Sequence, residues 1–442
     1  MTDAPLAGRS LHFIGIGGAG MSGLAVVARA LGARVTGSDA AESGYVAGLR
    51  AAGIEPHIGH DAANLPAGAE VVVSTAIPQD NPELSAARSA GARVLHRGDL
   101  LGELSAMKRT IAVAGTHGKT TTASMAAHAL RECGRDPAFL IGGELRSAHT
   151  NAAWGLGEWA VIEADESDRS FLALEPEVAV VTNIELDHHS TYASLRDLEQ
   201  AFAEFAAPAA LRVAGVGLEF AGDTLSFGIE AGDVRPENLE LTAGGSRFAV
   251  EGAVVELRVP GRHNVLNALA AVAACRAAGL TPAESAPALA SFTGAGRRFE
   301  EHGRTAAGAL VYDDYAHHPT EVRATLEGAR TLEPERLVAC FQPHLYSRTR
   351  MLAREFGRAL AVADVVVVVD VYPARERAED FPGVSGLLVA RAAADAAAGR
   401  PVWWLPARAD AERMLRAELR EGDLLVTLGA GNIDDLARGL TA

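Results

Sequence analysis

The residues best suited to chemistry in this chain form the run Gly115-Thr116-His117-Gly118-Lys119-Thr120-Thr121. The apolar stretch 110–114 before it predicts a buried parallel strand, and an alanine-rich stretch from about Lys119 to Cys133 predicts a helix after it. A glycine turn between such a strand and helix presents backbone N–H groups and the positive end of the helix dipole to a phosphate. Lys119 would reach the outer phosphates, and the hydroxyl of Thr120 or Thr121 would face Mg²⁺. The run therefore predicts a site for a nucleoside triphosphate.

The scarcity of lysine supports this role for Lys119. Among the 40 lysine and arginine residues only Lys108 and Lys119 are lysines, so arginine supplies the positive charge almost everywhere else. A position that keeps lysine in such a chain indicates a need for a compact ammonium rather than a planar guanidinium. The run departs from the full phosphate-loop motif, because Val113 stands where that motif has its first glycine. The alternative is a glycine turn that only joins a strand to a helix.

Composition limits the classes to which this chain can belong. Its 442 residues suggest about three domains, and no apolar run approaches the ~18 residues that a membrane span needs. The formal net charge of −16 argues against non-specific binding to nucleic acid, which needs a basic face. The cysteines, Cys133, Cys275 and Cys340, show no metal-binding or redox spacing. We therefore expect a cytoplasmic protein with free thiols that binds neither nucleic acid nor a membrane.

A second glycine-rich turn lies in the first segment, which runs to about residue 106. A predicted strand leads into Gly15-Ile16-Gly17-Gly18-Ala19-Gly20, which fits GxGxxG, and a second predicted strand ends at Asp39. An acidic residue about 20 positions after such glycines usually contacts a ribose hydroxyl in dinucleotide-binding folds. Taken alone, this pattern would suggest a nicotinamide-dependent oxidoreductase, although the turn suits any diphosphate.

The second segment, from about 107 to 299, adds polar clusters to the phosphate-binding run. Two of its predicted strands end in Glu163-Ala-Asp-Glu-Ser-Asp168 and Asn183-Ile-Glu-Leu-Asp-His-His189. Because the carboxyl ends of parallel strands meet at one edge of a sheet, we expect both clusters to lie beside Lys119. Carboxylate and hydroxyl oxygens are ligands that Mg²⁺ prefers. Short alternating runs from about 212 to 259 predict an antiparallel β insertion.

The third segment, from about 300 to 442, again alternates predicted strands with helices. The nearly pure valine run 364–370 predicts a strand that is buried on both faces. A single histidine in this segment could serve only for packing, but a group of polar residues after strand ends indicates a functional edge. This group is Asp314, His317, His344, Arg348 and Arg350.

Taken in order, the motifs resemble those of one family, the Mur ligases. The resemblance runs through all three segments and covers essentially the whole chain. The motifs that carry it are His12-Phe-Ile-Gly-Ile-Gly-Gly-Ala-Gly-Met-Ser-Gly23, Gly115-Thr-His-Gly-Lys-Thr-Thr-Thr122, Glu163-Ala-Asp-Glu-Ser-Asp168, Asp187-His-His189, Gly261-Arg-His-Asn-Val-Leu-Asn267, Gly296-Arg-Arg-Phe299, Asp313-Asp-Tyr-Ala-His-His-Pro-Thr-Glu321 and Phe341-Gln-Pro-His344.

The resemblance implies an α/β fold of three domains. Residues 1–106 would form a Rossmann-like domain that holds a UDP-sugar. Residues 107–299 would form a central P-loop ATPase-type α/β domain with a small β insertion. Residues 300–442 would form a C-terminal Rossmann-like α/β domain that closes over ATP and the amino acid.

The resemblance also implies an ATP-dependent ligation. ATP would phosphorylate a carboxylate, and an amine would then attack the acyl phosphate to give an amide, ADP and phosphate. The motifs match best the branch that joins L-alanine to the lactyl carboxylate of UDP-N-acetylmuramate in peptidoglycan precursor synthesis. We expect a monomer or a weak homodimer.

The resemblance assigns roles residue by residue. The catalytic residues would be Lys119, His188, Arg298, His344 and Arg348. The residues that contact ATP would be Gly115, Thr116, His117, Gly118, Lys119, Thr120, Thr121, His263, Asn264, Asn267 and Asp314. The ligands of Mg²⁺ would be Thr120, Glu163 and His188. The residues that contact the substrates would be Gly15, Gly17, Gly18, Ser22, Asp39, His317, His344 and Arg348.

One departure from the family pattern separates its branches. Several relatives that add later amino acids hold a second magnesium ion with a carbamylated lysine, but no lysine follows Lys119 here. This favours the alanine-adding branch, which does without that lysine. Three alternatives remain: a recycling ligase that attaches a preformed murein tripeptide to the same UDP-sugar, a nucleotide-binding regulatory module without catalysis, and the nicotinamide-dependent oxidoreductase.

Overall fold

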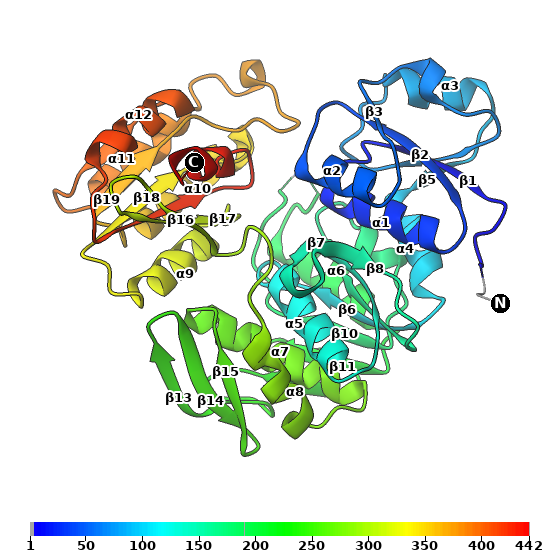
Figure 1. The fold of residues 1–442 in the computed structure, drawn as a ribbon, viewed down its shortest axis with the longest axis horizontal. Helices are drawn as coiled ribbons and strands as arrows, with labels where there is room; N and C mark the ends of the chain where they lie inside the picture. The colour runs from blue at the N-terminus through cyan, green and yellow to red at the C-terminus, as the bar shows by residue number, and fades with distance from the viewer. Residues whose placement is uncertain (1–3, 190, 442) are drawn as a thin grey trace. The chain divides into compact units, whose positions relative to one another are not determined.

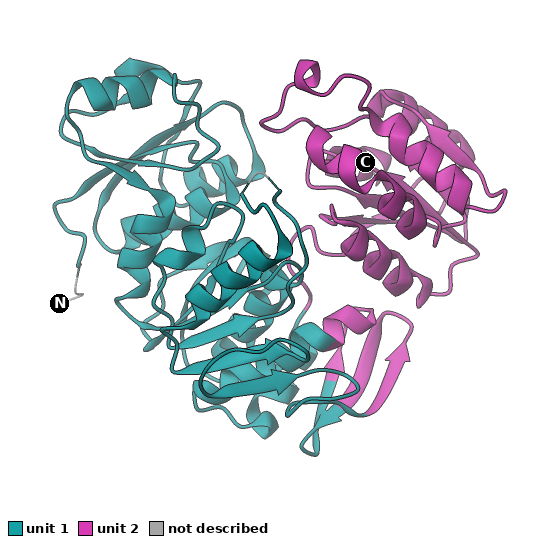
Figure 2. Ribbon diagram, turned by 180° about the vertical axis from the view of Figure 1, so that it is seen from behind, with its two compact units in different colours: residues 1–237, 249–255, 266–292 teal, residues 238–248, 256–265, 293–442 magenta. Residues whose placement is uncertain are grey.

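The structure is a computed structural model that describes residues 4–189 and 191–441. The chain divides into two compact units (Figure 2). Unit 1 consists of residues 1–237, 249–255 and 266–292, and unit 2 consists of residues 238–248, 256–265 and 293–442. No helix in the described part of the chain is long and apolar enough to cross a membrane.

The first sheet of unit 1 has five parallel strands in the order β3-β2-β1-β4-β5 (Figure 1). The order reverses between β1 and β4, and such a reversal is where an open parallel sheet holds its ligand. The strands are β1 (Ser10–Ile14), β2 (Arg34–Asp39), β3 (His57–Ile58), β4 (Glu70–Val73) and β5 (Val94–His96). The helices are α1 (Ala19–Ala30), α2 (Gly44–Ala51), α3 (Pro82–Ser89), α4 (Arg97–Ser105) and the 3-10 turn η1 (Ala62–Asn64).

The second sheet of unit 1 has seven strands in the order β12-β11-β10-β6-β9-β7-β8, with only β8 antiparallel to its neighbour. Its strands are β6 (Arg109–Ala114), β7 (Ala138–Leu145), β8 (Thr150–Ala153), β9 (Trp159–Glu163), β10 (Val178–Val181), β11 (Leu211–Gly215) and β12 (Thr224–Phe227). The remaining elements of this region are α5 (Lys119–Glu132), η2 (Arg146–Ala148), η3 (Ser170–Ala173), α6 (Leu195–Ala206), α7 (Arg262–Ala277), α8 (Pro282–Ala288) and η4 (Leu289–Ser291).

The predicted β insertion is shorter than expected. Strands β11 and β12 extend the central parallel sheet, and only β13 (Glu237–Thr242), β14 (Gly245–Val250) and β15 (Ala253–Leu257) form a separate sheet, which the boundary between the units crosses. The prediction that the insertion begins near residue 212 is therefore wrong. The reason is that a short apolar run such as β11, which is buried along most of its length, has the same pattern in an interior strand as in a hairpin.

The sheet of unit 2 has six strands in the order β16-β17-β21-β18-β19-β20. All neighbours are parallel except the edge strand β16, and the valine strand β19 is buried at three of its four residues, as predicted. The strands are β16 (Glu300–Arg304), β17 (Leu310–Asp314), β18 (Arg336–Phe341), β19 (Val365–Val368), β20 (Val402–Trp404) and β21 (Asp423–Leu428). The helices are α9 (Pro319–Arg330), α10 (Tyr346–Leu360), η5 (Ala378–Asp380), α11 (Gly386–Ala396), α12 (Arg408–Glu418) and α13 (Asp434–Thr441).

A buried carboxylate ties the first sheet to helix α3. Glu83 and Ser38 are fully buried, and the Ser38 hydroxyl donates to Glu83 Oε2 over 2.5 Å. Asn64 Nδ2 donates to Oε1 over 2.7 Å, and His12 Nε2 lies 3.3 Å from Oε2. Burial by itself would raise the pKa of Glu83, but the hydrogen bonds from His12, Ser38 and Asn64 outweigh it and lower the pKa to about 2. The charged form of Glu83 therefore stabilises the fold.

We predict that Glu83→Gln lowers the free energy of unfolding by about 3 kcal/mol at pH 7, because it removes a buried charge that three side chains and the Asp61 amide satisfy. A carboxyl group with a lowered pKa stabilises the fold above its unfolded pKa near 4.5 and loses that contribution as the pH falls toward 2. The difference between wild type and variant in urea unfolding should therefore shrink from pH 6 to pH 3. The control is Glu42→Gln on the exposed surface, which should change nothing measurable. A difference that stays constant with pH would contradict the assignment.

Candidate functional site

The loop between β6 and α5 has the geometry of a phosphate-binding turn, and the segment after β10 holds it in place. Thr116 N donates to Asn183 O over 3.0 Å, and His117 N donates to Asn183 Oδ1 over 2.9 Å. The Thr182 hydroxyl donates to His117 O over 2.6 Å. These contacts occupy the amides of Thr116 and His117. The first N–H groups of a helix have no acceptor within that helix, so those at the start of α5, which begins at Lys119, can donate to a phosphate.

Two positions of this loop require glycine. Gly115 and Gly118 have φ values of +131° and +82°, which side chains rarely adopt. A Cβ atom at Gly115 would overlap the hydroxyl of Thr182, and one at Gly118 would overlap Oδ1 of Asn267. The close approach of Asn267, a predicted ATP contact, explains why the turn carries no side chain here.

The ammonium of Lys119 is held at the loop by two carbonyl oxygens and a carboxylate. Its Nζ donates to Gly115 O over 2.6 Å and to Thr116 O over 3.2 Å, and it lies 3.0 Å from a carboxylate oxygen of Glu166. Burial by itself lowers the pKa of Lys119, but Glu166, Asp165 and Glu163 outweigh it and raise the pKa. The ammonium is therefore charged at neutral pH and is already placed at the turn.

Two of the predicted magnesium ligands meet beside Lys119. The Thr120 hydroxyl donates to Glu163 Oε1 over 2.9 Å, and Gly142 N donates to Glu163 Oε2 over 2.6 Å. A hydroxyl and a carboxylate oxygen at this distance, next to a phosphate-binding turn, are the hard ligands that suit Mg²⁺. These residues fit the predicted metal ion.

Glu166 is a site residue to which the sequence reasoning gave no role. Its side chain is 1% exposed, and besides Lys119 it approaches His188, whose Nε2 lies 3.4 Å from Glu166 Oε1. His188 adopts a positive φ of 52°, which is uncommon for a residue other than glycine. The only signal in the sequence was the place of Glu166 in the acidic run after β9.

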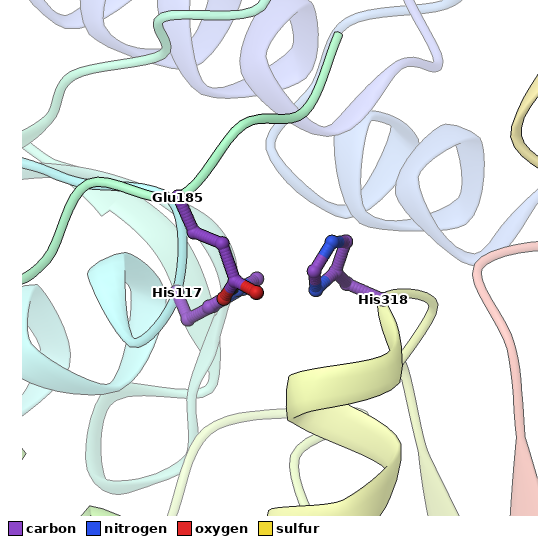
Figure 3. Close-up of side chains that lie close together, drawn as sticks. All are labelled: His117, Glu185 and His318. Carbon is purple, nitrogen blue, oxygen red and sulfur yellow. Dashed lines mark hydrogen bonds and ion pairs between the residues drawn. The ribbon is translucent and has the colours of Figure 1, made fainter. Parts of the chain in front are cut away.

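His117 pairs with Glu185 rather than pointing freely into the turn. The distance from His117 Nε2 to Glu185 Oε2 is 2.9 Å (Figure 3). Thr116 Oγ1 donates to Glu185 O over 2.9 Å and accepts from Glu185 N over 2.8 Å. The polar cluster after β10 therefore stabilises the loop between β6 and α5 through Glu185. His318, also labelled in Figure 3, belongs to unit 2, where its Nδ1 accepts from Thr320 N at the start of α9.

The glycine-rich turn after β1 holds together through Asp39 and Ser22. Gly17 N donates to Asp39 Oδ2 over 2.8 Å, so this carboxylate shapes the turn itself. Ser22 is 2% exposed, and its hydroxyl donates to Ala19 O over 2.9 Å and accepts from Asn151 Nδ2. The contacts of Gly15, Gly17, Gly18, Ser22 and Asp39 with a substrate stay predictions.

In unit 2 the structure brings three of the predicted substrate residues together. Arg348 Nη1 lies 3.2 Å from His344 Nδ1, and the ring centroids of His317 and His344 are 6.0 Å apart. Arg348 is 4% exposed, so its guanidinium is largely shielded from solvent. Arg350, which the sequence placed in the same group, instead lies over the ring of Phe381 at 5.2 Å.

Other predicted residues of unit 2 lie at three places: Asp314 ends β17, Arg298 lies just before β16, and His263 and Asn264 lie in the first turn of α7. Asp314 accepts from Phe299 N and Ala316 N over 2.7 Å each, and burial raises its pKa to about 6, although Arg298 opposes this shift. The Arg298 guanidinium lies 5.2 Å from the ring centroid of Tyr315. Burial lowers the pKa of His263 to about 4, and Asn264 Nδ2 donates to Pro260 O over 2.7 Å.

We predict that Gly118→Ala weakens the binding of ATP by at least about tenfold, because the added methyl group displaces Asn267 and distorts the turn. The matched control is Gly134→Ala at the other end of α5. Gly134 also has a positive φ, of +71°, but nothing lies within 4 Å of its added Cβ. This control should lower stability by about 1 kcal/mol and leave ATP binding intact. Calorimetric titration of both variants tests the prediction, and equal losses in the two would contradict it.

Comparison with known families covers the chain in three consecutive parts. Residues 10–109 match the profile described as "Mur ligase family, catalytic domain", residues 113–275 match the "Mur ligase middle domain", and residues 297–431 match the "Mur ligase, glutamate ligase domain". The predicted fold class of three α/β parts is confirmed. The predicted boundaries at 106/107 and 299/300 stay predictions.

Individual proteins that are similar to this chain belong to the same family. The chain is 46% identical to a UDP-N-acetylmuramate–L-alanine ligase of Acidithiobacillus ferrooxidans, over 97% of this chain and 96% of that protein. Among solved structures it is similar to the UDP-N-acetylmuramate–alanine ligase of Thermotoga maritima, with a TM-score of 0.85, 32% identity and 98% of each chain covered. It is also similar to a murein peptide ligase of Psychrobacter arcticus, with a TM-score of 0.76, 26% identity and 98% of each chain covered. The phosphate-binding turn, the paired Thr120 and Glu163, and these full-length matches together show that the chain belongs to the Mur ligase family.

Proposed function

We propose that this chain joins L-alanine to the lactyl carboxylate of UDP-N-acetylmuramate, with conversion of ATP to ADP and phosphate. The observation that carries the proposal is the arrangement of Lys119, Thr120 and Glu163 at the carboxyl edge of the central sheet. The names of the relatives that match over their full length support these substrates. The reaction belongs to peptidoglycan precursor synthesis.

The chemistry explains why such a site is needed. A carboxylate is a poor electrophile, so one of its oxygens attacks the γ-phosphorus of ATP and ADP leaves. The amine of L-alanine then attacks the carbonyl carbon, phosphate leaves with the C–O bonding pair, and the amine gives up a proton. Phosphoryl transfer of this kind depends on positioning and charge neutralisation.

The residues of unit 1 fit the first step. Lys119 would neutralise the β- and γ-phosphates, since its ammonium is already held at the turn by Gly115 O. Thr120 and Glu163 would hold one Mg²⁺ and His188 would contact a second, and bound Mg²⁺ supplies neutralisation of phosphate charge. Asn267 would contact the nucleotide beside Gly118.

The residues of unit 2 would serve the carboxylate and the amine. His344 and Arg348 would contact the substrate carboxylate and the incoming alanine, with His317 beside them. Arg298 would contact the γ-phosphate, and Asp314, His263 and Asn264 the nucleotide. No lysine follows Lys119, so the second metal site would be completed without a carbamylated lysine.

We predict that ADP release requires both UDP-N-acetylmuramate and L-alanine. A coupled assay with Mg·ATP should show turnover with L-alanine, while the murein tripeptide in its place should give less than a tenth of that rate. Turnover with the tripeptide alone would identify a recycling ligase. ATP binding without turnover on either acceptor would instead favour a regulatory module, and a nicotinamide cofactor bound to the purified protein would favour an oxidoreductase.

We predict that Lys119→Ala and Lys119→Arg each lower kcat by at least about 10³-fold, because a guanidinium cannot take the compact place of an ammonium between two carbonyl oxygens. The matched control is Lys108→Arg. The Lys108 ammonium donates to Gly155 O over 3.0 Å, away from the turn, so this variant should keep normal turnover. Circular dichroism should show that all three variants are folded. Normal activity in Lys119→Arg would overturn the role of Lys119.

A further inference from the structure

Arg97 is a mostly buried cation that the proposed reaction does not use. It is the first residue of α4 and follows directly on β5, so it lies at the carboxyl edge of the first sheet of unit 1. Its side chain is 18% exposed. The sequence gave no reason to single it out among 38 arginines.

Two carboxylates fix the orientation of its guanidinium. Arg97 Nε donates to Asp168 Oδ2 over 2.9 Å, and Nη2 donates to Asp165 Oδ2 over 2.6 Å. Nη2 also lies 3.4 Å from the hydroxyl of Ser170. Both carboxylates belong to the acidic run after β9, which contains Glu163. Arg97 therefore joins the carboxyl edge of the first sheet to the carboxyl edge of the central sheet.

The remaining edge of the guanidinium faces the first glycine-rich turn. A Cβ atom placed on Gly20 would lie 3.2 Å from Arg97 Nη1, and among the described residues no other heavy atom outside the neighbouring residues and backbone of α1 lies within 4 Å of it. Gly20 is the third glycine of the GxGxxG pattern and lies in the first turn of α1. The N–H groups of that turn and the helix dipole favour an anion at the same place.

We propose that Arg97 Nη1 donates to an anionic oxygen of the sugar-nucleotide substrate, either of the diphosphate or of the lactyl carboxylate. The inference rests on the proposed function, because it assigns a further binding residue to that substrate. The two negative charges of Asp165 and Asp168 exceed the single positive charge of Arg97, so this group has no net positive charge to attract an anion. Arg97 instead contributes N–H donors with a fixed direction. In this position it places the bound substrate beside the acidic run that carries Glu163.

Binding of two ligands distinguishes the two anions. UDP-N-acetylmuramate carries both groups, whereas UDP-N-acetylglucosamine carries the same diphosphate without the lactyl carboxylate. The variant Arg97→Lys keeps a positive charge beside Asp165 and Asp168. Its single ammonium group cannot contact both aspartates and also take the place of Nη1 as a donor to the substrate. The variant Gly20→Ala leaves every charge in place and presses a methyl group against Nη1, and it should fold well because alanine favours a helix.

We expect calorimetric titration to show about 10- to 100-fold weaker binding of UDP-N-acetylmuramate to Arg97→Lys, the loss typical of a hydrogen bond to a charged group. Gly20→Ala should weaken binding in the same direction. ADP should bind to both within about twofold of wild type. The matched controls are Arg93→Lys, on an arginine that is 58% exposed, and Gly48→Ala in α2, where nothing lies near the added Cβ.

The binding of the two sugar nucleotides shows which anion Arg97 contacts. Weaker binding of both sugar nucleotides assigns Arg97 to the diphosphate, and weaker binding of UDP-N-acetylmuramate alone assigns it to the carboxylate. Wild-type affinity of Arg97→Lys for both ligands would overturn the inference. If wild type binds UDP-N-acetylglucosamine but not UDP-N-acetylmuramate, the proposed function fails, while the role of Arg97 is still decided on the diphosphate. If wild type binds neither, both fail.

Discussion

The ammonium of Lys119 has to stay charged where little water reaches it, and the site in unit 1 follows from this constraint. Its side chain is 15% exposed, and a buried charge is tolerated only when partners replace the lost water. Here two carbonyl oxygens of the turn and the carboxylate of Glu166 do so. Binding of a triphosphate would bring new negative charge to the same ammonium. The protein's own groups therefore hold the ammonium at the turn.

Parallel sheets explain how distant residues come to serve one site. The carboxyl ends of β6, β9 and β10 lie next to one another because these strands are neighbours in the sheet. One edge of the sheet therefore carries the glycine turn that follows β6, Glu163 at the end of β9, and Asn183 just after β10, which accepts from the amide of His117. The same rule applies at the edge of the first sheet, where β1 leads into the glycine-rich turn and β5 leads into Arg97. The acidic run after β9 contacts both systems, which gives unit 1 a continuous polar edge.

Most elements that carry the site could be predicted from local pattern. Strand β6 and helix α5 appear within one residue of the expected bounds. Strands β1, β9 and β10 end at or just before the glycine-rich turn and the polar clusters that were expected to follow them. That Thr120 and Glu163 lie together was expected from the family resemblance, which made both of them ligands of Mg²⁺. The addition of β11 and β12 to the central sheet was not expected, because a short apolar run such as β11 has the same pattern in that sheet as in a hairpin.

The sequence by itself determined which residues have the chemistry for phosphate, since a strand, a glycine turn and a helix are encoded within about 25 consecutive residues around Lys119. Only the tertiary structure decided which partners those residues take. Arg97 meets Asp165 and Asp168 across 68 and 71 positions of the chain, and Glu166 was one of several equivalent acids until the fold placed it between Lys119 and His188. The physical reason is that strand order selects such partners. Strand order depends on long-range packing, whereas the turns depend on local backbone conformation.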